Sequence, residues 1–412
     1  MKLLFLSDNF PPEGNAPATR LYEHATRWVN SGHEVTVITC APNFPEGRVF
    51  DGYKNRWYSV EDVDGIRVVR VKTYITANEG FVKRTLDYVS FMASGFFAGL
   101  FQKRPDLVVA TSPQFFAAIG GWALAKVRRL PFVFEVRDLW PASIVAVGAM
   151  EESRVVRWLE KLELFLYRQA DAVVPVTHAF KRDMVERGID QNKIEVVLNG
   201  VDLTRYAPAE AKDPQLVAEH GLDGKFVVGY LGTHGMAHGL DKVLEAASLL
   251  RDNDDVRFVF AGSGAQRDSL IQKCEEQELH NVIMLPRQPK EAVARFWSLC
   301  DVALIPLRDD PVFSTVIPSK LFEAMGMGVP ILMSLPKGEA TSIVEDEGVG
   351  ITVQPDSPAL LAEAVRRLKD DKPLYAQLKE QCAASAGKYS RDHFAQEMTR
   401  IFDAVVAKRG AR

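Results

Sequence analysis

Two series of short apolar runs, separated by segments long enough for helices, constrain the fold of this chain more than any other feature. Most of the runs are apolar throughout, as in parallel strands that helices cover on both faces. The alternation of strands and helices therefore predicts an α/β fold made of two doubly wound, Rossmann-like domains. The runs are 2–6, 34–39, 66–71, 106–110, 132–136, 171–176 and 194–198, then 226–231, 256–261, 281–285, 301–306, 329–333 and 348–353.

The domain boundary is predicted where the first series ends. Residues 199–214 contain two prolines and no clear apolar period, which is typical of a linker. Near the end of the chain the apolar positions share one helical face, so a terminal helix should pack onto another surface. We expect an N-terminal domain of residues 1–205, completed by a C-terminal helix at about 388–412, and a second domain of residues 206–387. Such domains bind ligands at the carboxyl ends of their strands.

Composition argues against several other classes of protein. The net charge is -4 and no basic stripe dominates, which disfavours a nucleic-acid partner. The four cysteines form no C-x-x-C pair, so we expect reduced thiols in the cytoplasm and neither a zinc site nor a disulfide framework. The D-x-D patterns at 62–64 and 252–254 precede predicted strands and indicate turns. No metal and no other cofactor is expected.

The longest apolar stretch covers residues 88–101, which is shorter than the roughly 20 residues that span a bilayer. Its simplest interpretation is a buried helix. The alternative is a helix within residues 81–104 that makes peripheral contact with the inner face of a membrane, because basic residues flank the stretch. These residues are Lys83 and Arg84 before it and Lys103 and Arg104 after it.

In the first half, two loops that follow predicted strands carry polar candidates. Gly14 and Asn15 stand where the first loop enters a helix, whose free N–H groups could meet an anion, although an ordinary turn is equally compatible. Arg137 and Asp138 directly follow the strand at 132–136. The cation could meet a phosphate, and the carboxylate could accept hydrogen bonds from sugar hydroxyls or from an incoming nucleophile. The alternative is a structural Arg–Asp pair.

In the second half, a glycine-containing loop follows the strand at 226–231. The backbone N–H groups near Gly232 and Thr233, together with a helix start, could hold a diphosphate without a metal. His234 and His238 could assist or could be plain loop residues. The sequence FAGSGAQRDSL at 260–270 repeats the strand, glycine and helix pattern.

Two further segments of the second half carry candidates. Pro286 and Arg287 lie just past a strand, where a base or a diphosphate could rest. In PSKLFEA, Pro318 suits a helix start, which places Lys320 and Glu323 three residues apart on one helical face. The carboxylate could take both hydroxyls of a ribose, and the ammonium could neutralise a leaving diphosphate. An i,i+3 salt bridge on a solvated helix is the alternative.

The order of these motifs resembles glycosyltransferase family 4, whose members are retaining enzymes of the GT-B fold. The chain is most similar to the bacterial O-antigen and capsule subgroup typified by N-acetyl-L-fucosaminyltransferases. The resemblance covers nearly the whole chain. It rests on FPPEG (10–14), RDLWPASIVAVG (137–148), IEVVLNGVDLTRYAP (194–208), YLGT (230–233), HGLDKVLEAA (238–247), FVFAGSGAQRDSL (258–270), CDVALIPL (300–307) and PSKLFEAMGMGVPIL (318–332).

The resemblance implies an activity and its substrates. A sugar, such as an N-acetylated amino sugar or a deoxy sugar, would move from a nucleotide diphosphate donor, expected to be UDP-linked. The acceptor would be a glycan or a polyprenyl-diphosphate-linked saccharide in surface polysaccharide synthesis. The residues that it assigns to the donor are Glu323 at the ribose, Gly232 and Thr233 at the diphosphate, Pro286 and Arg287 beside the base, and Gly14 against the phosphates or the sugar, with Ser319 as a further donor-binding residue.

The chain departs from the family pattern at three places. Thr315 replaces the first glutamate of E-x7-E, which contacts the sugar in the family, so that role is left open here. The arginine and lysine often found in the loop after the first strand of the second domain align with Thr233 and His238. Positive charge must then come from Lys320 and from Arg287. Many relatives also carry histidine where this chain has Arg137.

These observations combine into one mechanistic hypothesis. The donor diphosphate lies at a helix N-terminus near Gly232 and at Lys320, and domain closure brings Gly14, Arg137 and Asp138 to the sugar. Two alternatives stay open: a GT-B nucleotide-sugar 2-epimerase, which needs no acceptor, and a non-catalytic nucleotide-binding partner subunit. A nicotinamide dehydrogenase is disfavoured because no G-x-G-x-x-G follows the first strand.

Overall fold

The computed structural model describes residues 1–44, 46–76, 81–112, 115–141 and 153–410. The chain divides into two compact units. Unit 1 comprises Met1–Leu198 with Arg391–Arg412, and unit 2 comprises Asn199–Ser390. The boundaries thus fall at 198 and 390, where the sequence placed them at 205 and 387.

Unit 1 is built on a sheet with the order β3-β4-β2-β1-β5-β6-β7, in which only β3 runs antiparallel to its neighbour. The chain leaves β1 toward β2 and later returns to the other side of β1 with β5. The loops after β1 and β5 therefore border the switch point at the carboxyl edge, where doubly wound sheets bind ligands. The strands are β1 (Lys2–Leu6), β2 (Glu34–Cys40), β3 (Tyr58–Val63), β4 (Ile66–Val71), β5 (Leu107–Thr111), β6 (Phe132–Val136) and β7 (Ala172–Pro175).

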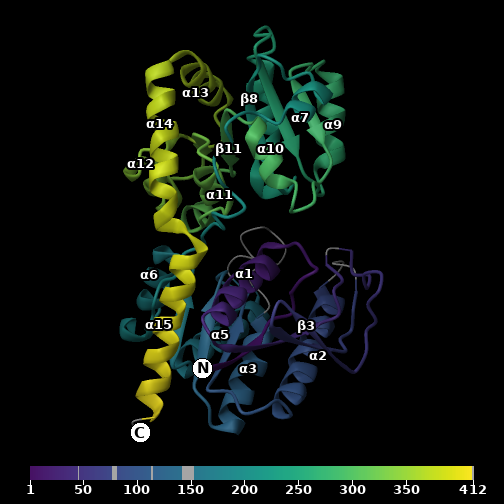
Figure 1. The fold of residues 1–412 in the computed structure, drawn as a ribbon, viewed down its shortest axis with the longest axis vertical. Coiled ribbons are helices and arrows are strands. Elements are labelled where there is room, and N and C mark those ends of the chain that lie inside the picture. Colours follow the sequence, from purple (N-terminus) through teal and green to yellow (C-terminus); the bar gives the residue numbers. More distant parts are fainter. Residues whose placement is uncertain (45, 77–80, 113–114, 142–152, 411–412) are drawn as a thin grey trace. The chain divides into compact units, whose positions relative to one another are not determined.

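The terminal helix packs on unit 1, as the sequence predicted. Phe5 of β1 stacks on Trp28, and the Trp28 indole Nε1 donates to the Ala395 carbonyl at 3.0 Å. A buried ion pair joins Arg391 to Glu23 at 2.9 Å. Figure 1 shows α15 as the last, yellow helix of the chain. The described helices of unit 1 are α1 (Ala16–Asn30), α2 (Phe81–Leu100), α3 (Phe115–Arg128), α5 (Arg154–Gln169), α6 (His178–Glu186) and α15 (Arg391–Gly410).

One prediction for unit 1 is wrong, and one strand was not predicted. Residues 194–198 were predicted to form a strand, but they make only an isolated bridge between Ile194 and Val173. The carbonyls of Val197 and Leu198 accept hydrogen bonds from the Arg20 guanidinium and not from a neighbouring strand. The strand β3 (Tyr58–Val63) was not predicted, and it contains the first two residues of the D-x-D pattern at 62–64. Its mixed polar sequence hides it from a search for apolar runs.

A two-residue turn joins β3 to β4. Asp64 and Gly65 both have positive φ, at 52° and 80°, and the Gly65 N–H donates to the Asp62 carboxylate at 3.0 Å. Such an Asp-Gly turn matches the twist of an antiparallel hairpin. The first D-x-D pattern is therefore part of a hairpin.

Unit 2 is built on a parallel sheet with the order β10-β9-β8-β11-β12-β13. Here the switch point lies between β8 and β11 (Figure 1). All six predicted runs of the second series form strands, with ends shifted by at most two residues. The strands are β8 (Phe226–Leu231), β9 (Val256–Ala261), β10 (Val282–Leu285), β11 (Val302–Pro306), β12 (Ile331–Ser334) and β13 (Gly350–Val353).

Helices cover both faces of the second sheet, and the core between them contains buried aliphatic and aromatic side chains such as Phe258 and Phe260. This confirms the predicted class of two doubly wound α/β domains. The described helices are α7 (Pro214–Glu219), α8 (Leu240–Ser248), α9 (Arg267–Glu276), α10 (Val293–Leu299), α11 (Lys320–Gly326), α12 (Glu339–Asp346), α13 (Pro358–Asp370) and α14 (Lys372–Ser385), with 3-10 turns η2 (Met236–His238) and η3 (Pro311–Thr315).

The predicted helix over the long apolar stretch is α2. Its Phe91 is fully buried against the sheet of unit 1. Across the described ranges, no helix has both the length and the apolar character needed to cross a bilayer.

Candidate active site

The loop after β8 lies at the switch point of unit 2 and differs from the predicted form. A helix N-terminus was expected near Gly232, but α8 begins only at Leu240. Between them the chain makes the 3-10 turn η2, and Gly239 takes a left-handed conformation with φ of 55° before the helix starts. The N-terminus of α8 therefore lies eight residues after Gly232 in the chain, and not at Gly232 as predicted.

Lys320 occupies the place next to Gly232. Its Nζ donates to the Tyr230 hydroxyl at 3.3 Å and lies 4.3 Å from the centre of the Tyr230 ring. Gly232 has φ of 156°, and a Cβ on it would stand 2.3 Å from the Lys320 Cε. Glycine at this position is therefore required for the lysine to lie against the loop. The structure brings together these two predicted residues, which are 88 positions apart in the chain.

The environment of Lys320 lowers the pKa of its ammonium group. Burial lowers the pKa of Lys320 to about 8, although the Glu323 carboxylate acts in the opposite direction. Burial also raises the pKa of Tyr230, whose hydroxyl donates to the Thr233 carbonyl at 2.5 Å. At neutral pH the lysine thus remains mostly charged. Because the Tyr230 hydroxyl donates its own proton to Thr233, its oxygen is free to accept a hydrogen bond from the Lys320 ammonium.

His234 and His238 surround the same tyrosine. Both ring centroids lie 5.9 Å from that of Tyr230. Burial lowers the pKa of His234 to about 4 and of His238 to about 3, and the Lys320 charge adds to both shifts. Within the described residues, neither ring nitrogen of the fully buried His234 has a hydrogen-bond partner. Each histidine can therefore offer a neutral N–H donor at pH 7.

The second glycine loop packs against the first. A Cβ on Gly262 would stand 1.8 Å from the Gly232 carbonyl oxygen, and a Cβ on Gly264 would stand 2.5 Å from that of His234. The loop leads into α9, whose first residue, Arg267, is close enough to lower the pKa of His234. Within the described part of the chain its Nε has no hydrogen-bond partner. The sequence did not single out Arg267, although it stands only three residues after the G-x-G pattern.

Glu323 is held one turn after Lys320 on α11. The Trp297 indole Nε1 donates to its Oε2 at 3.2 Å. The side chain of Ser319 makes no capping hydrogen bond, while its carbonyl accepts from the Glu323 N–H at 3.3 Å. Lys320 has Tyr230 as its hydrogen-bond acceptor and acts on Glu323 through its charge. Lys320 and Glu323 are therefore three residues apart on α11, as the sequence predicted.

Three other residues considered from the sequence lie in connecting segments of unit 2. Thr315, which replaces a family glutamate, donates from its hydroxyl to the Val312 carbonyl at 2.7 Å and so closes η3. Pro286 and Arg287 follow β10, and both are exposed. Their neighbour Leu285 accepts from the Gly262 N–H at 3.3 Å, which links this strand end to the second glycine loop.

The candidates of unit 1 meet at the start of α1. Asn15 is the N-cap of α1, and its side chain accepts from the Ala18 N–H at 2.9 Å and donates to Asn9. That cap uses one of the N–H groups that could have met an anion. Arg137 reaches this region, since its Nη2 donates to the Ala16 carbonyl at 3.2 Å. Gly14 is exposed just before the cap.

Arg137 and Asp138 are fixed by the end of β5. The Ser112 hydroxyl accepts from the backbone N–H of Arg137 at 2.7 Å and from that of Asp138 at 3.4 Å. Burial lowers the pKa of Arg137 to about 10 and raises the pKa of Asp138 to about 6. The rest of this predicted motif, from residue 142 on, lies outside the described residues.

Three carboxylates that the sequence did not assign gather at the end of β1. Burial raises the pKa of Asp8 to about 6 and the pKa values of Glu13 and Asp87 to about 7, and the charge of Asp8 contributes to the last two shifts. Glu13 accepts from the backbone N–H groups of Asn43 and Phe44 at 2.8 and 2.9 Å. Asp8 follows β1 directly, which is the sequence signal that could have marked it.

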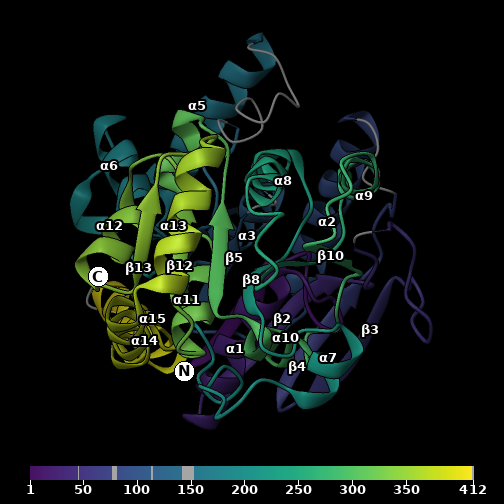
Figure 2. The same ribbon diagram turned by 90° about the horizontal axis from the view of Figure 1, so that it is seen from above.

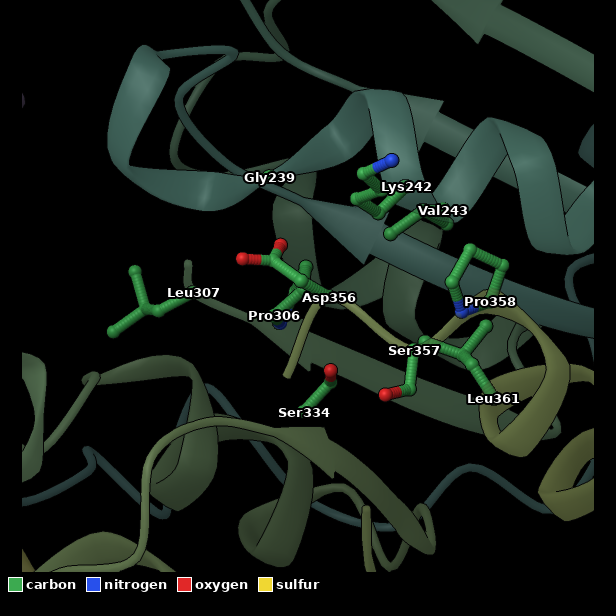
Figure 3. Close-up of a pocket in the computed structure, with 10 residues that line it drawn as sticks. All are labelled: Gly239, Lys242, Val243, Pro306, Leu307, Ser334, Asp356, Ser357, Pro358 and Leu361. Carbon is green, nitrogen blue, oxygen red and sulfur yellow. The ribbon is translucent and has the colours of Figure 1, made fainter. Parts of the chain in front are cut away.

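A small pocket of unit 2 adjoins the β8 loop (Figure 3). It lies where the start of α8 meets the ends of β11 and β12, and Asp356 at its rim accepts from the Asp309 N–H at 3.0 Å. The pocket is lined by Gly239, Lys242, Val243, Pro306, Leu307, Ser334, Asp356, Ser357, Pro358 and Leu361.

Among the described residues, no group of three or more His, Cys, Asp or Glu side chains is arranged to hold a metal ion.

Comparison with known families gives the class of this protein. Residues 15–200 match the glycosyl transferase 4-like domain, and residues 213–384 match glycosyl transferases group 1. These matches fall on unit 1 and unit 2. With two doubly wound domains, the chain is a glycosyltransferase of the GT-B fold.

Individual relatives agree with this class. The chain is 25% identical over 376 residues to the putative colanic acid biosynthesis glycosyl transferase WcaI of Escherichia coli K12, covering 89% of this chain and 92% of the relative. Sucrose-phosphate synthase from Thermosynechococcus elongatus has the same fold, with a TM-score of 0.79 at 16% identity over 99% of both chains. Anabaena HepE, solved in complex with UDP-glucose, has a TM-score of 0.71 at 17% identity over 98% of this chain and 100% of its own.

Proposed function

We propose that this enzyme is a retaining glycosyltransferase that moves a sugar from a UDP-linked donor to a glycan or a polyprenyl-diphosphate-linked saccharide during surface polysaccharide synthesis. The observation that carries the proposal is the Lys320 ammonium held against Gly232, one turn before Glu323. Support for the donor comes from HepE, solved with UDP-glucose, and support for the process from WcaI, named for colanic acid biosynthesis. An N-acetylated amino sugar or a deoxy sugar is the proposed group.

The donor is proposed to lie on unit 2. Glu323 takes the ribose hydroxyls beside Ser319, and the base lies toward Pro286 and Arg287. The diphosphate lies on the loop at Gly232 and Thr233, where Lys320 and Arg267 offset its charge in place of a metal ion. His234 and His238 are neutral at pH 7 and contribute N–H donors rather than charge.

The reaction is proposed to proceed with net retention. The bond between the sugar and the diphosphate breaks, and the acceptor oxygen bonds to the same carbon from the face that the leaving group vacates. The acceptor proton passes to the departing diphosphate. The residues of unit 1 proposed to contact the sugar and the acceptor are Gly14, Asn15, Arg137 and Asp138. Of these, Asp138 is mostly ionised at pH 7, so its carboxylate can orient a hydroxyl group.

A panel of nucleotides and nucleotide sugars tests the proposal in two steps. Thermal shifts identify the ligand that binds, because a ligand of the folded state raises the melting temperature. The protein is then incubated with that donor alone and with a saccharide acceptor, and the product anomer is read by NMR. Transfer with retention is expected. A new nucleotide sugar from donor alone would instead identify an epimerase, and binding without transfer a partner subunit.

The pKa of Lys320 predicts a pH dependence for UDP binding. The ammonium is charged below its pKa of about 8 and is lost as the pH rises through that value. Affinity for UDP should therefore fall about ten-fold between pH 7 and pH 9, as measured by calorimetry. A Lys320→Arg variant, which stays charged, should give a flat profile over this range. An unchanged affinity of the original protein at pH 9 would contradict the prediction.

A methyl group at position 232 should displace Lys320. The Cβ of a Gly232→Ala variant would occupy the space of the Lys320 Cε, so the ammonium can no longer lie on the loop. We expect UDP affinity to fall about ten-fold, the effect of losing one charged hydrogen bond. Gly387→Ala is the matched control, because a Cβ there meets nothing within 4 Å. Equal UDP affinity of the two variants would contradict the proposed contact.

A further inference from the structure

The helix α2 is apolar on its outward face as well as on the face that packs on the sheet. Phe91 points inward and is fully buried, while Leu86 is 51% exposed and Phe97 is 60% exposed. Phe101, directly after the helix, is 84% exposed. A helix of a water-soluble protein ordinarily presents polar residues on its outer face. The exposed apolar residues of α2 therefore require a partner.

Exposed aromatic residues continue this surface beside α2. The backbone N–H of Tyr74 donates to the Ser90 hydroxyl at 2.7 Å, and the Gln102 side chain donates to the Tyr58 hydroxyl at 3.3 Å. These bonds place one tyrosine beside the middle of the helix and the other beside its end. Tyr74 is 48% exposed and Tyr58 is 47% exposed. In both views α2 and β3 lie on the same side of unit 1 (Figures 1 and 2).

Trp57 completes the row. The Ser94 hydroxyl of α2 donates to the Lys72 carbonyl at 2.7 Å, and the Lys72 Nζ lies 4.6 Å from the centre of the Trp57 ring. The Trp57 side chain is 78% exposed. The whole set is called the α2 surface, and its large apolar residues are Trp57, Tyr58, Tyr74, Leu86, Phe97 and Phe101.

The charges around the α2 surface are mainly basic, although the chain as a whole has a net charge of -4. Within the described ranges, none of the exposed cations around it pairs with a carboxylate. Of two nearby carboxylates, Glu61 pairs with Arg70 at 2.6 Å, whereas Asp106 accepts from the Lys2 backbone N–H at 2.7 Å and keeps its charge. The exposed cations are Lys54, Arg56, Lys72, Lys83, Lys103 and Arg104.

We propose that the α2 surface docks on an anionic lipid bilayer with α2 lying in the plane of the interface. Leu86, Phe97 and Phe101 enter the acyl boundary, Trp57, Tyr58 and Tyr74 lie at the level of the headgroups, and the cations at both ends of the helix meet lipid phosphates. Tryptophan and tyrosine suit this level because each has an apolar body and a polar tip.

This inference goes beyond the transfer reaction and explains how a lipid-linked acceptor could be reached. α2 begins at the carboxyl edge of the unit 1 sheet, after β4, and its Asp87 interacts by charge with Asp8 at the end of β1. A bilayer along α2 therefore lies beside the candidate acceptor end of unit 1. Only the outward face makes the contact, because Phe91, Gly95 and Ala98 face the protein.

Vesicle sedimentation with the full chain tests the proposal. Vesicles of phosphatidylcholine with about one-third phosphatidylglycerol should bind the protein, and vesicles of phosphatidylcholine alone should bind it far more weakly, with the difference reduced by salt. A Phe97→Ser, Phe101→Ser variant should bind anionic vesicles at least about ten-fold less. A Lys103→Glu, Arg104→Glu variant should bind about 30-fold less or worse.

The control is a double variant at an exposed apolar residue and an exposed cation of unit 2. Leu249 is 53% exposed and Arg251 is exposed nearby, so a Leu249→Ser, Arg251→Glu variant changes the same kinds of groups away from the α2 surface. It should bind vesicles as the original protein does. UDP binding should be equal in all variants, which keeps this test separate from the proposed function.

Two results would overturn the proposal. One is absence of binding to the anionic vesicles, or binding that the phenylalanine and charge variants share equally with the control. The other is a dimer in solution, detected by light scattering, that the Phe97→Ser, Phe101→Ser variant dissociates. That result would assign the α2 surface to a second copy of the chain.

Discussion

Replacing Lys320 by alanine should lower turnover at saturating donor by about 100- to 1000-fold, the cost of losing one preorganised charge at a developing anion. The departing diphosphate gains negative charge as the sugar leaves, so the ammonium matters more in the transition state than for the bound donor. The KM for the donor should therefore change much less than kcat. Initial rates over a range of donor concentrations measure both.

The matched control for this variant is Lys379→Ala. Lys379 is exposed on α14, in the same unit as Lys320, and should retain normal turnover when replaced. A Lys320→Arg variant separates charge from shape, because it keeps the charge but cannot lie against Gly232 in the same way. Normal turnover of Lys320→Ala would rule out its proposed role at the leaving group.

The sheets could be predicted from sequence because most strands are buried on both faces. Runs such as 226–231 and 256–261 are apolar throughout and became β8 and β9 with those bounds. The two failures have different causes. β3 alternates exposed and half-buried residues and so has no apolar run. The segment 194–198 is apolar but turns its last carbonyls to Arg20, a long-range contact that no local pattern contains.

The candidate site was predictable where spacing along one helix defines it. Lys320 and Glu323 required only a helix start and a count of three residues. Their environment was not predictable, because Tyr230 and Arg267 approach from other strand ends, and the aromatic ring under the lysine depends on how two glycine loops interlock. The helix expected near Gly232 begins at Leu240, since glycine fixes where a chain can turn but not how far the turn extends.

The carboxylates of unit 1 show the same limit. Asp8 and Glu13 precede α1, while Asp87 lies on α2 more than seventy residues later. Burial raises the pKa of each group, and the charge of Asp8 also raises the pKa values of Glu13 and Asp87; both effects depend on how α2 packs across the end of β1. A single acidic residue in a loop gives no indication of such a neighbour. Sequence reasoning therefore located the candidate residues of unit 2 more completely than those of unit 1.

Replacing Glu323 by alanine should weaken UDP binding at least about 100-fold. If the carboxylate accepts from both ribose hydroxyls, the variant loses two hydrogen bonds to a charged group, each worth about 1.5–3 kcal/mol. It also leaves the Trp297 indole without this acceptor. Calorimetric titration with UDP measures the effect. Glu380→Ala, at an exposed position of α14, is the control and should bind UDP normally.

A double comparison with 2′-deoxy-UDP decides whether Glu323 acts through the ribose. Removing the 2′-hydroxyl should weaken binding about ten-fold in the original protein but hardly at all in the Glu323→Ala variant, because the partner is already gone. If Glu323 only supported Trp297 or the fold of α11, the two losses would add instead. The coupling thus separates a direct ribose contact from a positioning role, and it does so even where the alanine variant binds poorly.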